Sequence, residues 1–404
     1  MKEVVVTGAC RTAVGKYLGT LKDIEPQEYA AHVVKEAAKR SKIGLDEPQE
    51  LIFGEVFGYT PNIARCAGLL AGVPIETPAH TIDRQCASSM EAIHSAMARI
   101  LSDDDDVFIC GGVESMSRLP YYLDPSVRAN PLRIGDKPLY DAFNHGVTIA
   151  QPVSMFPNLN MGLTAENVAD KYGITREAMD IFSVESQQKW KEAHDAGKFI
   201  DEIVPFTFDT KKGPVTFDTD EHPRPDTTFE KLSKLKPAFK FDGTGRVTAG
   251  NSAGMNDGAS AMVVMSSDAA RERGLQPMVK ILTSVTAAVD PRIMGIGPVP
   301  ATIKALKRTG LKLEDMGVIE LNEAFASQSV ACCNELGMPR GTEMYKRVNV
   351  NGGAIAHGHP VGSSGCRICV TLIYEMMRRG CKYGLATLCI GGGMGMATIF
   401  ELCD

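Results

Sequence analysis

The sequence predicts an α/β fold built from two similar halves, with a loop-rich segment inserted between them. Short apolar runs alternate with helical patterns through the first part of the chain, and the same alternation returns in the last third. Between these parts, proline, glycine, aspartate and charged residues become dense. Apolar runs separated by helices are typical of buried, largely parallel strands. We therefore predict an N-terminal half of residues 1–118 plus 251–275, an inserted loop domain of residues 119–250 and a C-terminal half of residues 276–404.

The composition excludes several classes of protein. Of the 404 residues, 44% are hydrophobic and 23% are charged, which is typical of a globular chain rather than a disordered one. The net charge of -6 gives no general attraction for nucleic acid. No apolar run approaches the roughly 20 residues of a membrane-spanning helix, and the first residues read as a strand rather than a signal peptide. We expect a cytoplasmic protein, bound neither to membranes nor to nucleic acid, whose 11 cysteines are reduced.

The first half is predicted to alternate strands and helices. Val4, Val5 and Val6 open the first strand, and a helical pattern covers residues 26–41. A further helix of about residues 87–101 follows a short turn. The remaining strands of this half are expected at residues 51–53, 80–83 and 107–110, the last ending in Gly111 and Gly112.

The inserted domain carries one clear helical stretch, residues 164–196. Its apolar spacing supports a helix, and Gly173 with Thr175 predicts a break within it. Segments of this kind usually provide binding surfaces and assembly contacts rather than the main sheet. We expect this domain to carry binding and assembly surfaces.

The last third is predicted to repeat the order of the first. Residues 347–350 read as a strand, followed by a glycine-rich turn, a helix and a second strand at residues 384–389 that ends in Gly391, Gly392 and Gly393. In the first half, the strand of residues 80–83 leads through a special turn and a helix to a strand that ends in two glycines. The repetition predicts a duplicated unit whose halves meet at one site.

Cys86 lies in the special turn of the first half, at or near the start of a predicted helix. Free backbone N–H groups and the helix dipole at such a position favour a thiolate and lower the cysteine pKa. Small neighbours, Ala87 to Ser89, leave room for a substrate. The alternative interpretation is a buried cysteine in a tight turn.

Three further residues have the chemistry of a catalytic group. His359 stands among glycines, so that its ring can project into a cavity and act as a base; the alternative is a structural histidine. Cys389 ends a strand before a glycine-rich turn whose N–H groups could stabilise an oxyanion. Asn322 directly follows the apolar run of residues 318–321, where active sites of α/β folds gather.

A metal site is the competing interpretation of the second glycine-rich turn. His357, His359, Cys366 and Cys369 form a His-x-His followed by a Cys-x-x-Cys. The two cysteines lie in an apolar helical stretch, where three-residue spacing also describes a core face. The spacing of paired zinc knuckles is missing, and we predict no metal.

Taken together, these segments resemble the thiolase family, and the resemblance runs nearly end to end. The order and spacing of the shared motifs are specific, although any one of them could occur by chance. The motifs are Arg11-Thr12, residues 86–90, 111–117, 161–167, 236–239 and 248–251, Asn322 to Phe325, Gly358 to Pro360, and Cys389 to Gly392.

The resemblance implies a duplicated five-layered α/β/α/β/α core with an inserted loop domain, assembled as dimers or tetramers. It implies Cys86 as the acylated nucleophile, His359 as its base and Cys389 as the second acid/base. Asn322 would hold a water that forms one oxyanion hole with His359, and the N–H groups of Cys86 and Gly391 would form the other. Two such holes suit a ping-pong Claisen reaction, which produces two oxyanions. Coenzyme A and acyl-CoA would be substrates, with no bound cofactor.

The substrate-binding positions that the resemblance implies are Met161, Arg224, Phe239, Ala253, Gly254, Met294 and Phe325. Some residues depart from the family pattern. His357 replaces a common aliphatic residue, and we favour a packing role for it. Ala253 stands where many members have a serine that contacts the pantetheine, and Asn160 stands where some short-chain members have histidine.

The expected activity is reversible Claisen condensation and thiolytic cleavage of short- to medium-chain 3-ketoacyl-CoA, with acetoacetyl-CoA foremost. One alternative is a condensing enzyme of the ketoacyl synthase type, which uses histidine or asparagine where this chain has Cys389. The other is a non-catalytic acyl-CoA or lipid-binding relative. Such a protein would not need Cys86, His359 and Asn322 together.

Overall fold

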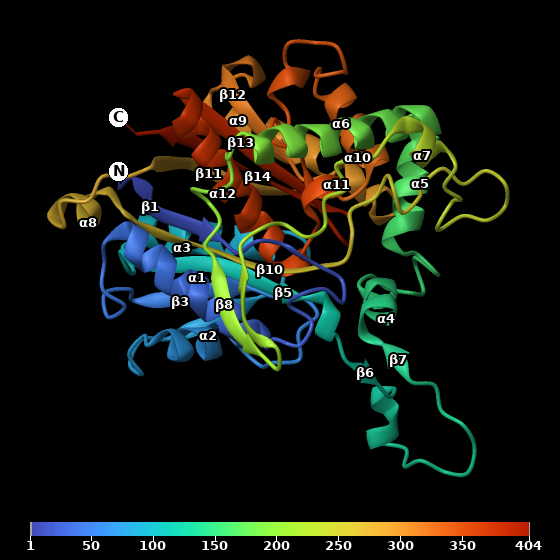
Figure 1. The fold of residues 1–404 in the computed structure, drawn as a ribbon, viewed down its shortest axis with the longest axis horizontal. Coiled ribbons are helices and arrows are strands. Elements are labelled where there is room, and N and C mark those ends of the chain that lie inside the picture. The colour runs from blue at the N-terminus through green and yellow to red at the C-terminus, as the bar shows by residue number, and fades with distance from the viewer. Residues whose placement is uncertain (1, 404) are drawn as a thin grey trace.

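A computed structural model describes residues 2–403 and shows two halves joined through one continuous path of hydrogen-bonded strands (Figure 1). The path runs β12-β13-β14-β11-β1-β10-β5-β3-β4. The strands of the N-terminal half are β1 (Val4–Arg11), β3 (Glu50–Gly54), β4 (Ala79–Ile82), β5 (Val107–Ser115) and β10 (Asn256–Ser266), with the short β2 (Gly15–Lys16) beside β10. The strands of the C-terminal half are β11 (Val279–Ala288), β12 (Met316–Leu321), β13 (Tyr383–Ile390) and β14 (Met394–Leu402).

The two halves are arranged symmetrically about the middle of this path. β1 and β11 are neighbours at the centre and share only two residue pairs, Val5 with Lys280 and Val6 with Val279. Outward from them the order is β10, β5, β3 on one side and β14, β13, β12 on the other. This mirrored order agrees with the duplication predicted from the sequence.

Helices form three layers around the two sheets. α1 (Pro26–Ser41) and α2 (Ile63–Ala71) cover the outer face of the N-terminal sheet, and α9 (Pro298–Thr309) with α10 (Ala326–Glu335) covers the outer side of the other half. Between the sheets lie α3 (Ser88–Leu101) and α12 (Val361–Arg379), which pack on each other. Gly365 allows this close approach, because a Cβ there would lie 2.7 Å from the backbone nitrogen of Met90. The layers therefore follow the order α/β/α/β/α that we expected.

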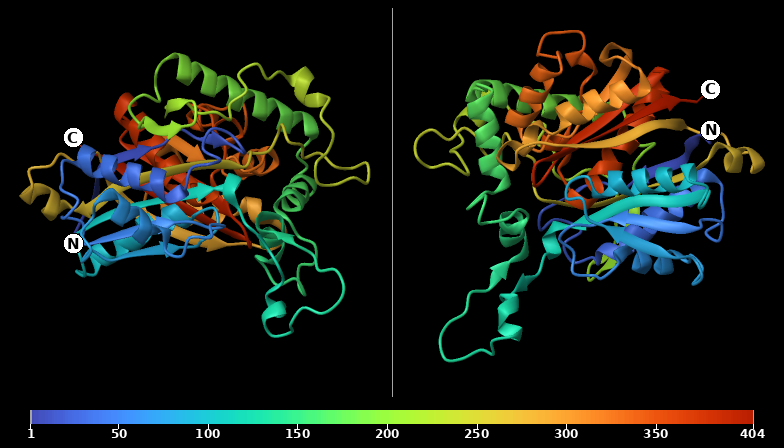
Figure 2. Two further views of the ribbon diagram at one scale, coloured as in Figure 1. Left: turned by 60° about the horizontal axis from the view of Figure 1, so that its bottom comes forward. Right: turned by 180° about the vertical axis from the view of Figure 1, so that it is seen from behind.

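The inserted segment wraps the outside of this core (Figures 1 and 2). α6 (Arg176–Asp195) lies along the C-terminal half, while an arm containing β6 (Tyr121–Tyr122), β7 (Tyr140–Asp141) and α4 (Ala142–Ile149) extends from the body. The other elements are α5 (Met161–Lys171), β8 (Phe206–Thr210), β9 (Gly213–Phe217) and α7 (Phe229–Ser233), and α8 (Ser267–Glu272) follows β10 in the N-terminal half. The predicted break separates α5 from α6, where Thr175 caps α6 by accepting a hydrogen bond from the Ala178 N–H.

A buried ionic cluster holds the inserted segment against β1. The Arg11 guanidinium is fully buried and donates to Glu202 at 2.7 Å and to Asp220 at 2.7 and 3.2 Å. The charge of Arg11 and its hydrogen bond keep the pKa of Asp220 well below its usual range despite burial. Both carboxylates belong to the inserted segment, so the cluster joins that segment to the core.

Three expectations about strands were wrong. The sheet is mixed rather than largely parallel, because only β3–β4, β3–β5 and β12–β13 are parallel pairs. β5 does not end at Gly111 and Gly112 but continues to Ser115. The two glycines lie within the strand, where the absence of a side chain lets the backbone of Ser260 in β10 approach Gly111 and that of Gly362 approach Gly112.

Residues 347–350 do not form the predicted strand. A 3-10 helix occupies Tyr345–Arg347, and Val348 makes a single bridge to Ile319. Asn349 has a left-handed backbone, with φ of 45°, which ends any extended run. Its carboxamide instead pairs with the backbone N–H and C=O of Leu321, both at 2.8 Å. An asparagine side chain thus replaces a strand peptide beside β12.

A search of the described residues for a helix long and apolar enough to cross a bilayer finds none.

Candidate active site

A mainly apolar pocket of about 110 Å³ opens where the two halves and the inserted segment meet. Few of the lining side chains are polar, and seven of the 17 lining residues are phenylalanine or methionine. The lining residues are Phe57, Gln85, Cys86, Met116, Phe143, Val147, Ala150, Met161, Ala253, Gly254, Met255, Met294, Ala324, Phe325, His359, Val361 and Gly391.

Cys86 reaches this pocket from the turn between β4 and α3. Gln85 has a left-handed backbone, with φ of 50°, although it is not glycine. Ser88 stabilises the turn, because its hydroxyl accepts from the Arg84 N–H at 2.9 Å and donates to the Gln85 carbonyl at 2.7 Å. A non-glycine residue held in this conformation costs about 1 kcal/mol or more and is frequent at functional sites.

The sulfur of Cys86 is a thiol in need of a base. Removal from water raises its pKa to about 11, and the N–H groups of Gly391 and of Cys86 itself counteract this shift only in part. The lowered pKa expected from the helix N-terminus is therefore wrong, because burial outweighs the effect of the backbone N–H groups. The same two N–H groups lie where an oxyanion formed at Cys86 would need donors.

His359 supplies a base of the required kind. Its backbone N–H donates to Asn256 Oδ1 at 2.9 Å, and its Nδ1 lies 2.6 Å from Ser364 Oγ. The Ser364 hydroxyl donates its proton to the Pro360 carbonyl at 2.8 Å, so Nδ1 must carry the proton of the ring. Nε2 is then the free base; it is buried and has no hydrogen-bond partner among residues 2–403.

The protonation state of His359 agrees with this role. Burial first, and then the charge of Arg367, lower its pKa to about 4. The ring is therefore neutral at pH 7 and can accept a proton from the Cys86 thiol.

Cys389 and Asn322 lie behind the pocket, at the ends of neighbouring strands. Cys389 is fully buried near the end of β13, and burial, followed by the negative charge of Cys86, raises its pKa above the usual range for a thiol. Asn322 follows β12 and anchors itself through a backbone hydrogen bond to Thr387 at 3.0 Å. Neither atom of its buried carboxamide bonds to another described residue, which leaves the amide available to water or to a substrate oxygen.

The predicted substrate-binding residues divide into two groups. Met161, Ala253, Gly254, Met294 and Phe325 line the pocket. Phe239 lies behind Phe325, with the two rings edge to face at 6.2 Å, and Arg224 is exposed on the inserted segment away from the pocket walls. The structure therefore brings five of the seven to the pocket itself.

Several lining and supporting residues were not found from the sequence. Ser364 orients His359 and stands five residues after it, so proximity in the chain was an available signal. Gln85 directly precedes Cys86. Phe57, Phe143 and Asn256 come from segments with no motif, and only the folded chain shows their contribution.

The other members of the second glycine-rich turn face elsewhere. His357 is fully buried, with Nδ1 3.0 Å from Asp220 Oδ2 and its ring edge to face with Phe199. This position supports the packing role that we favoured. Cys366 and Cys369 are buried in α12 among apolar side chains, so the four candidate metal ligands do not converge.

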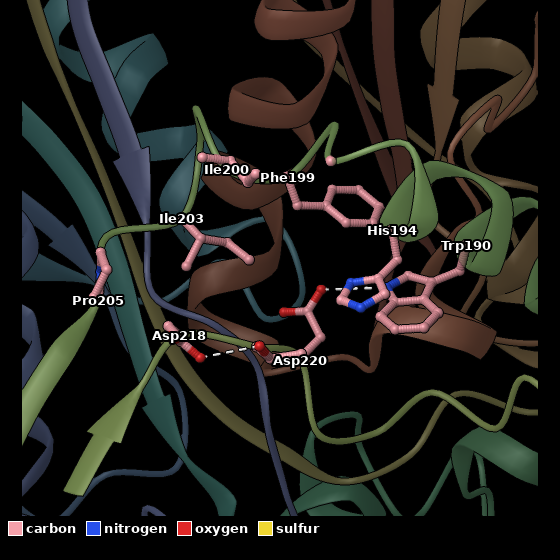
Figure 3. Close-up of a pocket in the computed structure, with 10 residues that line it drawn as sticks. Trp190, His194, Phe199, Ile200, Ile203, Pro205, Asp218 and Asp220 are labelled. Atoms are coloured by element: carbon pink, nitrogen blue, oxygen red, sulfur yellow. Dashed lines mark hydrogen bonds between the residues drawn. The ribbon is translucent and has the colours of Figure 1, made fainter.

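A second cavity, of about 290 Å³, lies beside the ionic cluster (Figure 3). Trp190 and His194 stack on one side, and Phe199 and Ile203 form further walls. Asp220 lies at its base, where its carboxylate accepts from Trp190 Nε1 at 3.4 Å and is also bound by Arg11. Neither cysteine nor serine is among its lining residues in the described part of the chain.

Comparisons with known proteins agree with this geometry. The family described as "Thiolase, N-terminal domain" matches residues 4–268, and "Thiolase, C-terminal domain" matches residues 275–402. An acetyl-CoA acetyltransferase of Syntrophomonas wolfei is 47% identical over 99% of both chains. The beta-ketothiolase BktB of Cupriavidus necator is 44% identical over 99% of both chains.

Solved structures give the same result. The acetyl-CoA acetyltransferase of Bacillus anthracis superposes with a TM-score of 0.93 at 43% identity, covering 100% of this chain and 99% of that one. A human mitochondrial 3-ketoacyl-CoA thiolase in complex with CoA gives a TM-score of 0.92 at 41% identity, covering 100% and 98%.

Proposed function

This chain belongs to the thiolase family, and we propose that it is an acetyl-CoA C-acyltransferase that forms and cleaves 3-ketoacyl-CoA through an acyl-cysteine. The observation that carries the proposal is one pocket lined by Cys86, by His359 with its free Nε2, and by Gly391. A nucleophile, its oriented base and oxyanion donors in one enclosed pocket are what acyl transfer requires. Coenzyme A and acyl-CoA are the substrates.

In the first half-reaction, His359 Nε2 takes the Cys86 proton and the sulfur attacks the thioester carbonyl of an acyl-CoA. The N–H groups of Cys86 and Gly391 stabilise the tetrahedral oxyanion. Cys389 gives its proton to the departing CoA sulfur, which leaves an acyl group on Cys86, a thiolate at Cys389 and the proton on Nε2 of His359. The raised pKa of Cys86 is the reason that this step needs a base.

In the second half-reaction, the Cys389 thiolate removes the α-proton of an incoming acetyl-CoA, and the protonated Nε2 of His359, with a water held by Asn322, stabilises the resulting enolate oxygen. The carbanion attacks the acyl carbon and releases the Cys86 sulfur, which takes its proton back from His359, and the 3-ketoacyl-CoA is formed. The reverse sequence is thiolytic cleavage, in which Cys389 protonates the carbanion that leaves. The buried carboxamide of Asn322 and the location of Cys389 near Cys86 support these roles.

The pocket favours a short or medium acyl group, with acetoacetyl-CoA the foremost substrate. Its volume of about 110 Å³ has room for few carbons, and Phe57, Phe143 and Met294 narrow its walls. Neither alternative activity is favoured. A ketoacyl synthase would have histidine or asparagine in place of Cys389, and a pure binding protein has no need of an oriented base.

We further propose a cytoplasmic homo-oligomer, a dimer or tetramer, that serves fatty acid metabolism and needs no metal or bound cofactor. The strand path ends at β4, whose outer edge has no neighbour in the described chain. The arm carries exposed apolar side chains, Leu132, Ile134 and Leu139. Unpaired edges and exposed apolar surface are suited to contacts between subunits.

The decisive experiment measures CoA-dependent consumption of acetoacetyl-CoA, beside a series of longer 3-ketoacyl-CoA substrates. We expect turnover that falls with chain length and is lost in Cys86→Ala, together with a Cys86 acetyl adduct detected by intact mass after exposure to acetyl-CoA. Well-folded protein that turns over no chain length and forms no adduct would instead be a binding protein.

A further inference from the structure

Gln85 is a polar side chain in the wall of the pocket that the mechanism does not use. Neighbouring residues of an extended chain point to opposite sides, but Gln85 and Cys86 both line the same cavity. The left-handed backbone of Gln85, with φ of 50°, is what turns both side chains to one side. The turn therefore presents a carboxamide beside the nucleophile.

The carboxamide lies close to the proposed oxyanion hole. A Cβ placed on Gly391 would lie 3.3 Å from Gln85 Oε1, so the side chain rests against the residue whose N–H faces the Cys86 sulfur. The Gln85 backbone is engaged, since its N–H donates to Asp83 and its carbonyl accepts from Ser88. Its carboxamide makes no hydrogen bond to any other residue in the part of the chain that the structure describes.

The surroundings make this free carboxamide costly once a substrate fills the pocket. Phe57, Met116, Phe143 and Val147 form apolar walls. An amide that loses its water to an apolar acyl chain and gains no new hydrogen-bond partner costs about 1–3 kcal/mol of free energy. The cost disappears if the acyl chain brings an oxygen to which the amide can bind.

The charges around the pocket determine which kind of substrate oxygen can bind there. No lysine or arginine lines the pocket, and the carboxylates of Asp83 and Glu114 place negative potential at Cys86. A carboxylate on the substrate would be repelled there, whereas a neutral hydroxyl would not. A carboxamide can both donate to and accept from a hydroxyl.

We propose that Gln85 is a specificity-determining residue that binds an uncharged oxygen, such as a hydroxyl, on the acyl chain. Among 3-ketoacyl-CoA substrates of equal length, those hydroxylated one or two carbons beyond the reacting ketone are then preferred over plain hydrocarbon chains. The proposal rests on the thiolase activity proposed above and refines its substrate class.

The test compares thiolysis of 3-ketohexanoyl-CoA with that of 4-hydroxy- and 5-hydroxy-3-ketohexanoyl-CoA. We expect wild-type kcat/KM to be about tenfold higher for at least one hydroxylated substrate, since sites built to hydrogen-bond a hydroxyl discriminate against its absence. In Gln85→Met, which keeps the length of the side chain and the same backbone strain, the ratio should fall to about one. Gln85→Asn should retain part of the preference.

The outcomes separate this inference from the proposed function. Turnover of acetoacetyl-CoA with a wild-type ratio near one, or a ratio that survives Gln85→Met, overturns the role of Gln85 alone. An equal loss of kcat for every substrate in Gln85→Met, with the ratio intact, would make the carboxamide an oxyanion donor and also overturn it. Absence of turnover for all substrates contradicts the thiolase activity itself.

Discussion

At the scale of single residues, the hydroxyl of Ser364 determines whether His359 can act as a base. It accepts from Nδ1 and thereby leaves the lone pair of the ring on Nε2, which faces the pocket. Without that acceptor, neutral histidine can move its proton to Nε2, and the ring then cannot take a proton from Cys86. Ser364 is thus a positioning residue for the reaction.

Replacing Ser364 by alanine should slow acetylation of Cys86 by about 10–100-fold, which is part of the roughly 10²–10⁴-fold that general-base catalysis contributes, because the base remains but its tautomer is no longer fixed. KM for acetyl-CoA should change little. Rapid-quench mass spectrometry of the acetyl adduct measures the rate. Ser364→Thr should restore part of it, because it retains the hydroxyl.

Ser363→Ala is the matched control, since the Ser363 hydroxyl contacts Ser260 rather than His359. A pH profile adds a second measurement. The pKa of His359 is lowered to about 4, so wild-type kcat/KM should fall only as the pH drops toward that value and the ring gains its proton. An acid limb near 6.5, or equal losses in both serine variants, would contradict this account.

At the scale of secondary-structure elements, the carboxylate of Glu114 joins the pocket wall to the start of α12, and a second carboxyl group, Glu55, lies near it. Glu114 of β5 accepts from the backbone N–H groups of Phe57 at 3.2 Å and Gly362 at 2.9 Å. Glu55, just after β3, lies close to Glu114, so ionising both carboxyl groups costs electrostatic free energy. Burial first, and then Glu114, raise the pKa of Glu55 to about 8.

Glu55→Gln should therefore stabilise the protein at alkaline pH. In the wild type, folding keeps Glu55 protonated between its unfolded pKa near 4.5 and its folded pKa of about 8, so stability falls as pH rises through this window. Glutamine does not titrate, so the stability of the variant lacks this dependence on pH. Urea unfolding at pH 5 and pH 8 should show a gain of about 2 kcal/mol at pH 8 and much less at pH 5.

An exposed glutamate on α1, Glu28, provides the control for this effect. Glu28→Gln should unfold with the wild-type dependence on pH. If Glu55→Gln gives the same gain at both pH values, the effect arises from packing rather than from protonation.

At the scale of the whole molecule, the ionic cluster around Arg11 holds the inserted segment on the core. Removal of one partner from a buried ion pair leaves uncompensated charges and costs about 3–5 kcal/mol. Arg11→Met should therefore lower the free energy of unfolding by that amount, measured in urea. Arg273→Met, which breaks a partly exposed pair with Glu47, should cost about 1 kcal/mol or less. Equal losses in the two variants would show that the cluster has no special role.

The sequence predicted more of the core than of the details that surround the site. Apolar runs and helical spacing predicted α1 and the alternation of strands and helices, because those patterns depend on burial alone. The turn at Asn349 escaped prediction, since a carboxamide takes the place of a peptide there. The raised pKa of Cys86 also escaped, because desolvation depends on the side chains that enclose the sulfur. The tautomer of His359 required the contact with Ser364, which a motif does not encode.

The position of β10 has a consequence for the nascent chain. This strand, residues Asn256–Ser266, lies between β1 and β5, although the whole inserted segment separates it from them in the sequence. Until residue 266 has left the ribosome, β1 and β5 each expose an unpaired apolar edge. Exposed edges of this kind attract other strands and promote aggregation during synthesis. The N-terminal half therefore cannot close its sheet co-translationally before about two thirds of the chain has been made, and two strand edges of the growing polypeptide stay open to intermolecular pairing over that interval.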